Sequence, residues 1–439
     1  MTTPLQFPIQ SNEDVPGLPF PLPDIKDVPP FINSLILLID PSAEKGREML
    51  QEAINKALEF QVDVQLKWKI NTVDMFLRFA AGHLKWIPTE DHSGNTIYLT
   101  ICLFYFILDQ DPVSGMQTKI VPSEVDRPLT VISQWITMFA MRVGDFMSTE
   151  ASLTPESLAS FENQKDFHME EALYPPGGFK TFNQLFCRHL KPGRRPIVGD
   201  DKTIVFPADS RYDCAAPVNN DSTVTIKQLP WSINALLRGS AYSGEFAGGT
   251  WMHSFLGPRD YHRQHAPVSG KVLEAKVIQG LCYLEVDVEK KDKSGKSILR
   301  PHRSWETPKF QLRPDEPFDE VGAPNTAGYQ FIQTHGCIII ENPVVGLVAV
   351  LPVGMAYVSS VNLSVQSRYE TNGPLPSYVN KGDEISNFQF GGSDIVVVFQ
   401  GRKPGWQGKP GPPGVKITAK PDQHYNYGEE LAIVTDDLF

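Results

Sequence analysis

The sequence predicts an α+β protein in which a helical N-terminal part precedes a β-rich C-terminal part. Two long segments, 43–60 and 131–147, carry apolar residues at helix-like spacing. Further along the chain, the pattern changes to short runs rich in β-branched residues and separated by Gly and Pro. A chain of 439 residues is long enough for two or three domains with a large buried core. The change of period therefore predicts a helical region followed by a region of β-sheet.

The N-terminal part is predicted to be a leader followed by a helical domain. Residues 1–30 are rich in Pro and are expected to be extended and poorly ordered. The helical region spans residues 31–175, and Ser42 is a candidate N-cap for its first long helix. Residues 149–180 are rich in Ser, Asn, Pro and Gly and are predicted to form a linker. The β-rich region then occupies residues 176–439.

The longest apolar run covers residues 97–108 and stops at Asp109. It is too short for a membrane-spanning helix, which needs about 20 residues. A buried helix or strand is the simpler interpretation, and a lipid-facing surface is the alternative. We therefore expect no transmembrane segment. Because the first residues also lack a signal-like stretch, we expect a cytoplasmic, soluble protein.

The β-rich region contains several candidate strands bounded by turn residues. These are residues 270–277, 281–287, 336–340, 344–353 and 395–399. The last of them, Ile-Val-Val-Val-Phe, is continuously apolar, as expected for a strand buried on both faces.

Composition excludes some classes of partner. The chain has 51 acidic and 40 basic side chains and a net charge of -11. Nucleic acids and strongly anionic membranes both require a basic surface, so neither is an expected partner. The five cysteines are scattered without a CxxC pair, which predicts reduced thiols rather than a disulfide framework or zinc ribbon.

Three short segments carry candidate chemistry: Phe206–Asp209, Arg259–Pro267 and Phe388–Asp394. Each also has an ordinary structural interpretation. An Asp before a turn is commonly a cap, and Gly-Gly-Ser before a strand is commonly a plain turn. Two histidines three residues apart, His262 and His265, can be surface residues or metal ligands, but no third His or Glu lies nearby in the sequence.

Taken together, the three segments fit a chain that cuts itself at a serine. The Ser393 hydroxyl can attack the carbonyl of Gly392, which has no Cβ to hinder the approach. The resulting ester can eliminate to dehydroalanine, which hydrolyses to a pyruvoyl group. A base must remove the hydroxyl proton, and a histidine oriented by a carboxylate is suited to this task. His265 is the candidate base and Asp209 the candidate orienting acid.

The same residues resemble the phosphatidylserine decarboxylase family, and the resemblance runs in the family order from about Phe182 to the C-terminus. The segments that carry it are Phe182–Ile197, Pro207–Asp209, Asp260–Val268, Lys381–Ile385 and Phe390–Ser393. The resemblance implies cleavage between residues 392 and 393, giving a large chain 1–392 and a small chain 393–439. It also implies a pyruvoyl cofactor derived from Ser393 within a catalytic domain formed by residues 176–439. No metal is implied.

Carried over residue by residue, the resemblance implies a processing triad of Asp209, His265 and Ser393, with His262 assisting decarboxylation. Residues 31–175 are similar to an accessory domain found in one branch of the family. That branch includes the pyruvoyl-type L-tryptophan decarboxylase.

Two positions depart from the family pattern. Ser210 stands where Gly usually follows the acidic motif, and Asp394 stands where Thr or Ser usually follows the processing serine. A non-catalytic homologue that no longer processes is therefore one alternative. A serine hydrolase is another, but the chain lacks the G-x-S-x-G elbow around Ser393, which leads into a strand.

The implied catalytic chemistry restricts the substrate. A terminal ketone forms a Schiff base with an amine and accepts the electrons released with CO2. The expected substrate is therefore an α-amino carboxylate, and His262 is the candidate acid that protonates the product. A free amino acid, with an aromatic one as an option, is favoured over phosphatidylserine, because the sequence shows little that predicts membrane docking. The oligomeric state does not follow from the sequence.

Overall fold

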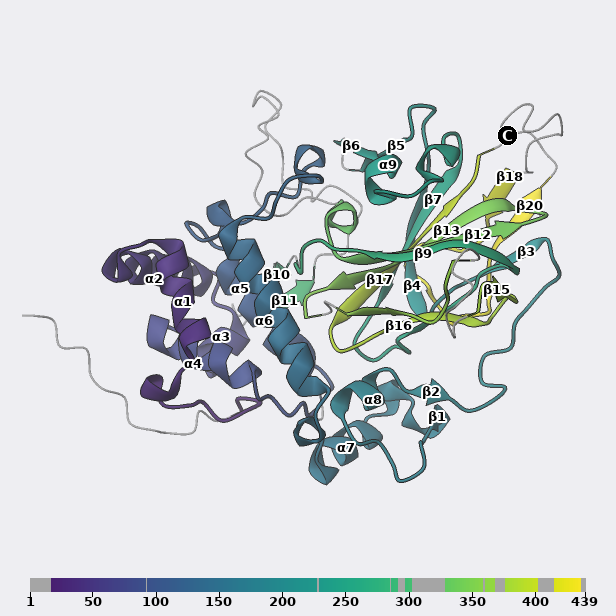
Figure 1. Cartoon of the computed structure of the whole chain (residues 1–439). Coiled ribbons are helices and arrows are strands. Elements are labelled where there is room, and N and C mark those ends of the chain that lie inside the picture. Colours follow the sequence, from purple (N-terminus) through teal and green to yellow (C-terminus); the bar gives the residue numbers. More distant parts are fainter. Residues whose placement is uncertain are drawn as a thin grey trace, which may run out of the picture.

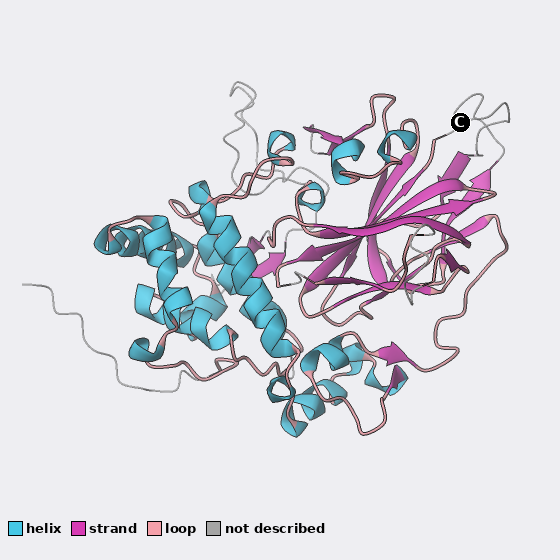
Figure 2. Cartoon of the chain, viewed as in Figure 1, coloured by secondary structure: helices cyan, strands magenta, loops and turns pink. Residues whose placement is uncertain are grey.

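The computed structural model confirms the α+β class, with helices gathered in the N-terminal part and strands in the C-terminal part (Figures 1 and 2). The structure describes residues 17–91, 93–226, 229–284, 286–290, 297–301, 328–357, 360–367, 376–401 and 414–435. The first 16 residues of the expected leader lie outside this part.

Six helices form most of the N-terminal part: α1 (Pro30–Ile39), α2 (Ala43–Glu59), α3 (Asp63–Lys67), α4 (Val73–His83), α5 (Thr96–Leu108) and α6 (Val131–Met147). The predicted helices at 43–60 and 131–147 are confirmed as α2 and α6. Ser42 is the N-cap of α2, because its side chain accepts a hydrogen bond from the Lys45 backbone.

The apolar run at 97–108 forms α5, and residues 100–108 of this helix are all buried. The expectation of a buried element is thus confirmed. Within the described residues, no helix has the length and apolar character needed to cross a membrane.

Two predictions about the connecting segments need correction. The described part of the leader packs on the helices, since Phe20 is buried and lies against the rings of Phe79 and His83. The predicted linker 149–180 contains helix α7 (Pro155–Glu162) and short 3-10 turns, followed by α8 (Phe182–Phe186). Thr154 caps α7 through its side chain, with Pro at the first helical position. This start signal outweighs the turn-forming composition.

The strand-rich part is built around one antiparallel sheet with the order β15-β9-β12-β13-β17-β7-β4-β19. Its strands are β4 (Ser210–Pro217), β7 (Thr250–Leu256), β9 (Gly270–Ile278), β12 (His335–Asn342), β13 (Gly346–Met355), β15 (Tyr378–Val379), β17 (Gly392–Phe399) and β19 (His424–Tyr425). The predicted strands at 270–277, 336–340, 344–353 and 395–399 are β9, β12, β13 and β17. The run 281–287 differs, because its regular strand is β10 (Val286–Lys290), paired with β11 (Ser297–Pro301).

Smaller sheets complete this part. One has the order β14-β16-β8, from β14 (Val361–Leu363), β16 (Glu384–Phe388) and β8 (Arg263–His265). Another has the order β18-β20-β3, from β18 (Gly414–Ile417), β20 (Glu430–Thr435) and β3 (Thr203–Val205). Short two-stranded pairs are formed by β1 (Ala172–Leu173) with β2 (His189–Leu190) and by β5 (Thr223–Ile226) with β6 (Leu229–Ser232). Helix α9 (Ile233–Leu236) follows β6.

The large sheet separates two hydrophobic cores. On one face, Val396 and Val398 of β17 belong to a core shared with the N-terminal helices, which we call the helix-side core. On the other face, Ile395 and Val397 pack with residues of the small sheets, including Phe388, in what we call the sheet-side core. Because side chains alternate along a strand, neighbouring residues of β17 enter different cores.

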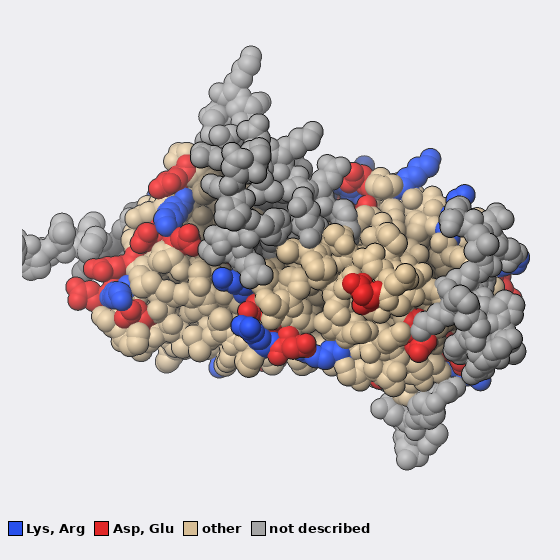
Figure 3. Space-filling model, turned by 90° about the horizontal axis from the view of Figure 1, so that it is seen from above, with Lys and Arg blue, Asp and Glu red and all other residues tan. Residues whose placement is uncertain are grey.

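All five cysteines are free, as predicted. On the face shown in Figure 3, acidic and basic side chains are interspersed, and the described residues form no broad basic patch there. This distribution agrees with the net charge of -11.

Candidate active site

The predicted cleavage position lies at the start of the central strand β17. Ser393 pairs with Leu256 of β7 on one side and with Gly354 of β13 on the other. Its side chain is fully buried, and its Oγ has no hydrogen-bond partner among the described residues. Gly391 has a φ of 147°, a backbone conformation that residues with a Cβ rarely adopt. The conformational requirement for glycine therefore falls on Gly391, one residue before the Gly392 that was predicted to need it.

A buried hydroxyl without a partner is costly and calls for an explanation. Gly354 leaves the space beside Ser393 free of a side chain on the β13 flank. Ser393 shares the face of Ile395, so it points toward the sheet-side core, where β8 and β16 lie. The strand β8, which ends at His265, belongs to the small sheet on this side.

His265 is held in a defined tautomer. Its Nδ1 lies 2.8 Å from the Gly382 carbonyl oxygen, which can only accept, so Nδ1 carries the proton. Nε2 is then the lone-pair nitrogen, and the Tyr261 hydroxyl donates to it at 3.3 Å. The ring stacks on Tyr427, with centroids 3.7 Å apart. Burial lowers the pKa of His265 to about 4, so the imidazole is neutral and competent as a base near pH 7.

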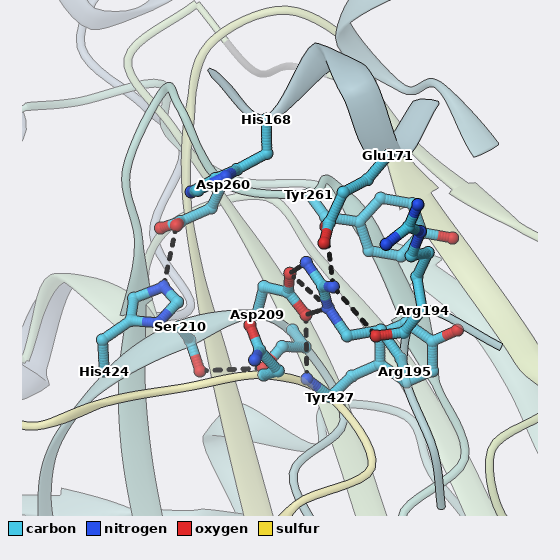
Figure 4. A network of polar contacts seen from close by, with 12 residues as sticks. His168, Glu171, Arg194, Arg195, Asp209, Ser210, Asp260, Tyr261, His424 and Tyr427 are labelled. Carbon is cyan, nitrogen blue, oxygen red and sulfur yellow. Dashed lines mark hydrogen bonds and ion pairs between the residues drawn. The ribbon is translucent and has the colours of Figure 1, made fainter. Parts of the chain in front are cut away.

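Asp209 binds Tyr427, the residue whose ring stacks on this histidine. Its carboxylate accepts hydrogen bonds from Arg195 at 2.7 to 3.1 Å and from the Tyr427 backbone N–H at 2.8 Å (Figure 4). Arg195 also bonds Glu171 at 2.8 Å. Burial raises the pKa of Asp209, and the Arg195 guanidinium opposes this shift.

Within the described part of the chain, no hydrogen bond or ion pair joins Asp209 to His265. Asp209 instead fixes the backbone of Tyr427, whose ring lies against the imidazole. The Gly382 carbonyl takes the orienting role that the sequence assigned to Asp209. Ser210 leaves the acidic motif intact, since its hydroxyl only donates to the Ala208 carbonyl at 3.1 Å.

A charged pocket of about 390 Å³ opens beside Asp209. Figure 4 shows several of its lining side chains converging around the Asp209–Arg195 pair. The lining residues include Arg188, Arg195, Asp209, Asp260, Tyr261 and His424. Both signs of charge are present, which suits a zwitterionic or otherwise mixed-charge ligand. Tyr261 connects the pocket to His265 through its hydroxyl.

His262 is fully buried. Its ring stacks on Phe186 of α8 with centroids 3.9 Å apart, and neither ring nitrogen makes a regular hydrogen bond with the described residues. Burial lowers its pKa to about 3, and the Arg188 charge acts in the same direction. The His262 carbonyl accepts from the Phe388 backbone N–H at 2.9 Å. His262 thus lies against the segment that leads into Ser393, but it is neutral in the uncut chain.

Several residues of this site carried no role in the sequence-based analysis. Arg195 lies within the Phe182–Ile197 segment, in a Gly-Arg-Arg-Pro run. Its sequence neighbours gave no indication of the residue that it binds. Tyr427, Gly382 and Tyr261 act through a backbone group, a ring face or a hydroxyl. The sequence does not show such roles, because they depend on contacts between distant segments.

A buried serine after paired glycines, on the sheet face that also carries a neutral histidine, is the arrangement expected of a proenzyme that cuts its own chain. Comparison with known sequences agrees with this class. The family model described as phosphatidylserine decarboxylase matches residues 182–433, more than half of the chain. The chain belongs to the phosphatidylserine decarboxylase family, whose members are pyruvoyl-dependent carboxy-lyases.

Individual relatives match over a similar number of residues. Phosphatidylserine decarboxylase proenzyme 3 of Schizosaccharomyces pombe is 30% identical over 58% of this chain and 22% of its own length. Proenzyme 2 of Oryza sativa is 28% identical over 65% of this chain and 39% of its own length. The proenzyme of Chlamydia muridarum is 29% identical over 60% and 73%, respectively. The chain thus spans well under half the length of the first two relatives.

Proposed function

We propose that this chain is a self-processing decarboxylase that cuts itself between Gly392 and Ser393 and uses the resulting pyruvoyl group. The observation that carries the proposal is the buried Ser393 hydroxyl, which lacks a partner and follows Gly391 and Gly392 at the start of a central strand. Membership of a family of pyruvoyl-dependent enzymes supports it.

Processing begins with the Ser393 hydroxyl. Its oxygen attacks the carbonyl carbon of Gly392, the C–N bond breaks, and an ester replaces the peptide. Loss of the Cα proton of residue 393 then expels the Gly392 carboxylate as the new end of the large chain. The dehydroalanine left behind adds water and loses ammonia, which leaves a pyruvoyl group at the start of the small chain. No oxidant or reductant is required.

His265 is proposed to take the hydroxyl proton through Nε2. The Gly382 contact keeps the proton on Nδ1, so the Nε2 lone pair is available once the long contact with Tyr261 gives way. No hydrogen bond joins His265 to Ser393 in the uncut chain, and such contacts commonly tighten only as a reaction proceeds. Asp209 is proposed as a positioning residue that acts through Tyr427.

The pyruvoyl group would supply an electrophilic carbonyl that takes up a substrate amine and accepts the electrons released with CO2. His262 is proposed to deliver the proton that replaces the carboxylate. Burial keeps the pKa of His262 at about 3, so the ring is neutral before the substrate binds. It must either take a proton from the substrate or have its pKa raised by a nearby anionic substrate.

The substrate is proposed to be an α-amino carboxylate, and we favour a free amino acid. The pocket beside Asp209 is lined by charges of both signs, which suits a zwitterion. Phosphatidylserine, the substrate after which the relatives are named, is the second candidate. The aromatic preference inferred from the tryptophan decarboxylase branch remains part of this proposal. The family match begins at residue 182, so it does not test the resemblance of the helical domain to that branch.

Substrate choice is tested by measuring CO2 release from each free amino acid beside phosphatidylserine vesicles. Release from a free amino acid supports the first candidate, and release from vesicles alone supports the second. Processing is tested separately by looking for two chains on a denaturing gel. Two chains without CO2 release from any substrate would retain the processing proposal and remove the substrate proposal.

A further inference from the structure

A buried ion pair involves Asp394, the residue that follows the processing serine. Asp394 follows Ser393 and, by strand alternation, projects into the helix-side core. Its side chain is fully buried, and its Oδ2 lies 3.1 Å from Nε2 of His253 on the neighbouring strand β7. The register explains the contact, because Val396 stands opposite His253 and Asp394 lies two residues away on the same face.

The second nitrogen of His253 also faces a carboxylate. Nδ1 lies 2.9 Å from Oδ2 of Asp213 on β4, the strand on the other side of β7. The register of β4 shifts between Tyr212 and Cys214, so a bulge at Asp213 directs its side chain toward β7. The same Nε2 lies 3.3 Å from the Gln330 side-chain amide, and its contact with Asp394 is an ion pair without hydrogen-bond geometry. Carboxylates beside both ring nitrogens favour the doubly protonated, imidazolium form of His253. Burial lowers its pKa, but Asp394 and Asp213 outweigh this effect and raise it to about 10.

Near Ser393, few side chains of β17 add to the backbone pairing with β13 and β7. Gly391 and Gly392 precede Ser393 without side chains, and Gly354 faces it from β13. A shift of one residue in a strand would turn every side chain to the opposite face. Asp394 is the first residue of β17 whose side chain forms a specific polar contact, and its partner is on a strand held within the sheet.

We propose that His253, supported by Asp213, is a positioning residue for self-processing. It holds Asp394 in the helix-side core, so the Ser393 hydroxyl is directed toward the sheet-side core, the side on which β8 lies. The inference rests on the proposed cleavage at Ser393. It also explains how this chain accommodates an acidic residue where the family usually has Thr or Ser, since the buried carboxylate has its own counter-ion.

The side chains of Asp213, Cys214 and His253 lie close enough together to be considered as metal ligands, with donor atoms within 4.8 Å of one another. The ion-pair account differs from a metal account in a measurable way. An imidazolium cannot ligate a metal through Nδ1, so the purified protein should contain no stoichiometric divalent metal.

The test compares cleavage rates of three variants with that of the parent chain, using precursor made by cell-free synthesis. His253→Gln leaves Asp394 buried without a counter-ion and should slow cleavage about 10-fold or more. The double variant His253→Gln with Asp394→Asn removes both charges and should return to within about threefold of the parent. Arg211→Gln is the control and should cleave normally. Arg211 lies on β4, as Asp213 does, and the substitution breaks only its exposed ion pair with Asp422.

Thermal unfolding of each variant accompanies the rates, so that a folding defect in the single variant is recognised. In that case the double variant decides: a folded double variant that cleaves supports the inference, and a folded one that does not cleave overturns it. Normal cleavage of folded His253→Gln, or a stoichiometric metal lost in that variant, would also overturn it. An uncleaved parent chain would instead remove the proposed processing itself.

Discussion

Tyr427 lies between Asp209 and His265: its backbone binds the carboxylate, and its ring stacks on the imidazole. The carboxylate accepts the Tyr427 N–H at 2.8 Å, while the aromatic ring lies parallel to the imidazole with an interplanar angle of 2°. A direct carboxylate–imidazole bond would control the tautomer of the histidine. The observed arrangement controls the position of the ring and leaves the tautomer to the Gly382 carbonyl.

This arrangement predicts that Asp209 and the Tyr427 ring contribute to the same step. Asp209→Asn should slow cleavage by about 10-fold, since it weakens a charge-assisted hydrogen bond that holds the Tyr427 backbone. Tyr427→Ala should give a similar loss because the imidazole loses its stacking partner, whereas Tyr427→Phe should cleave normally. Cleavage rates of the precursor measure all three. The double variant Asp209→Asn with Tyr427→Ala should lose little more than either single variant. If the two losses in activation free energy simply add in the double variant, the two residues act separately.

The low pKa of His265 predicts an unusual pH profile for processing. The base must be neutral, and burial keeps its pKa at about 4 instead of the ordinary 6.5. Cleavage of the precursor should therefore keep its rate from neutral pH down to about pH 5 and fall only as the pH approaches 4. His265→Ala should remain uncut at every pH. A rate that already halves near pH 6.5 would mean that the base is a histidine in an ordinary environment.

The two histidines are predicted to be separable by mutation. His262 stacks on Phe186 and makes no regular hydrogen bond, so its removal should leave processing nearly intact. His262→Asn should still give two chains but lose about 10²- to 10⁴-fold in CO2 release, the usual contribution of a positioned proton donor. A gel and a CO2 assay on one preparation measure both effects. His262→Asn protein that stays uncut, or that decarboxylates like the parent, would contradict this division of roles.

The fold was predictable where one physical signal dominated. Helix α2 begins at a Ser cap and β17 is a continuous apolar run, so both were found from local pattern. The segment 149–180 was misjudged because Thr154 and Pro155 start helix α7 rather than a turn. The run 281–287 was only partly right, since its regular pairing begins at Val286 and depends on a partner strand further along the chain.

The candidate site was predictable in its residue types but not in its contacts. Ser393, His265 and Asp209 were found because the chemistry of chain cleavage requires a hydroxyl, a base and a carboxylate. Their actual partners are a carbonyl, an aromatic ring and a guanidinium from segments distant in sequence. His253 was missed because its sequence neighbours suggest no role, and its partner Asp394 is distant in the sequence.

The most direct test of the account is the state of the chain at residue 393. Purified parent protein should run on a denaturing gel as two chains, and mass spectrometry should find a small chain that begins with a pyruvoyl group and ends at Phe439. Ser393→Ala lacks the attacking hydroxyl and should remain a single chain with no decarboxylase activity, although it folds. An active parent protein that is a single uncut chain, or a Ser393→Ala variant that is cut at the same place, would contradict the account.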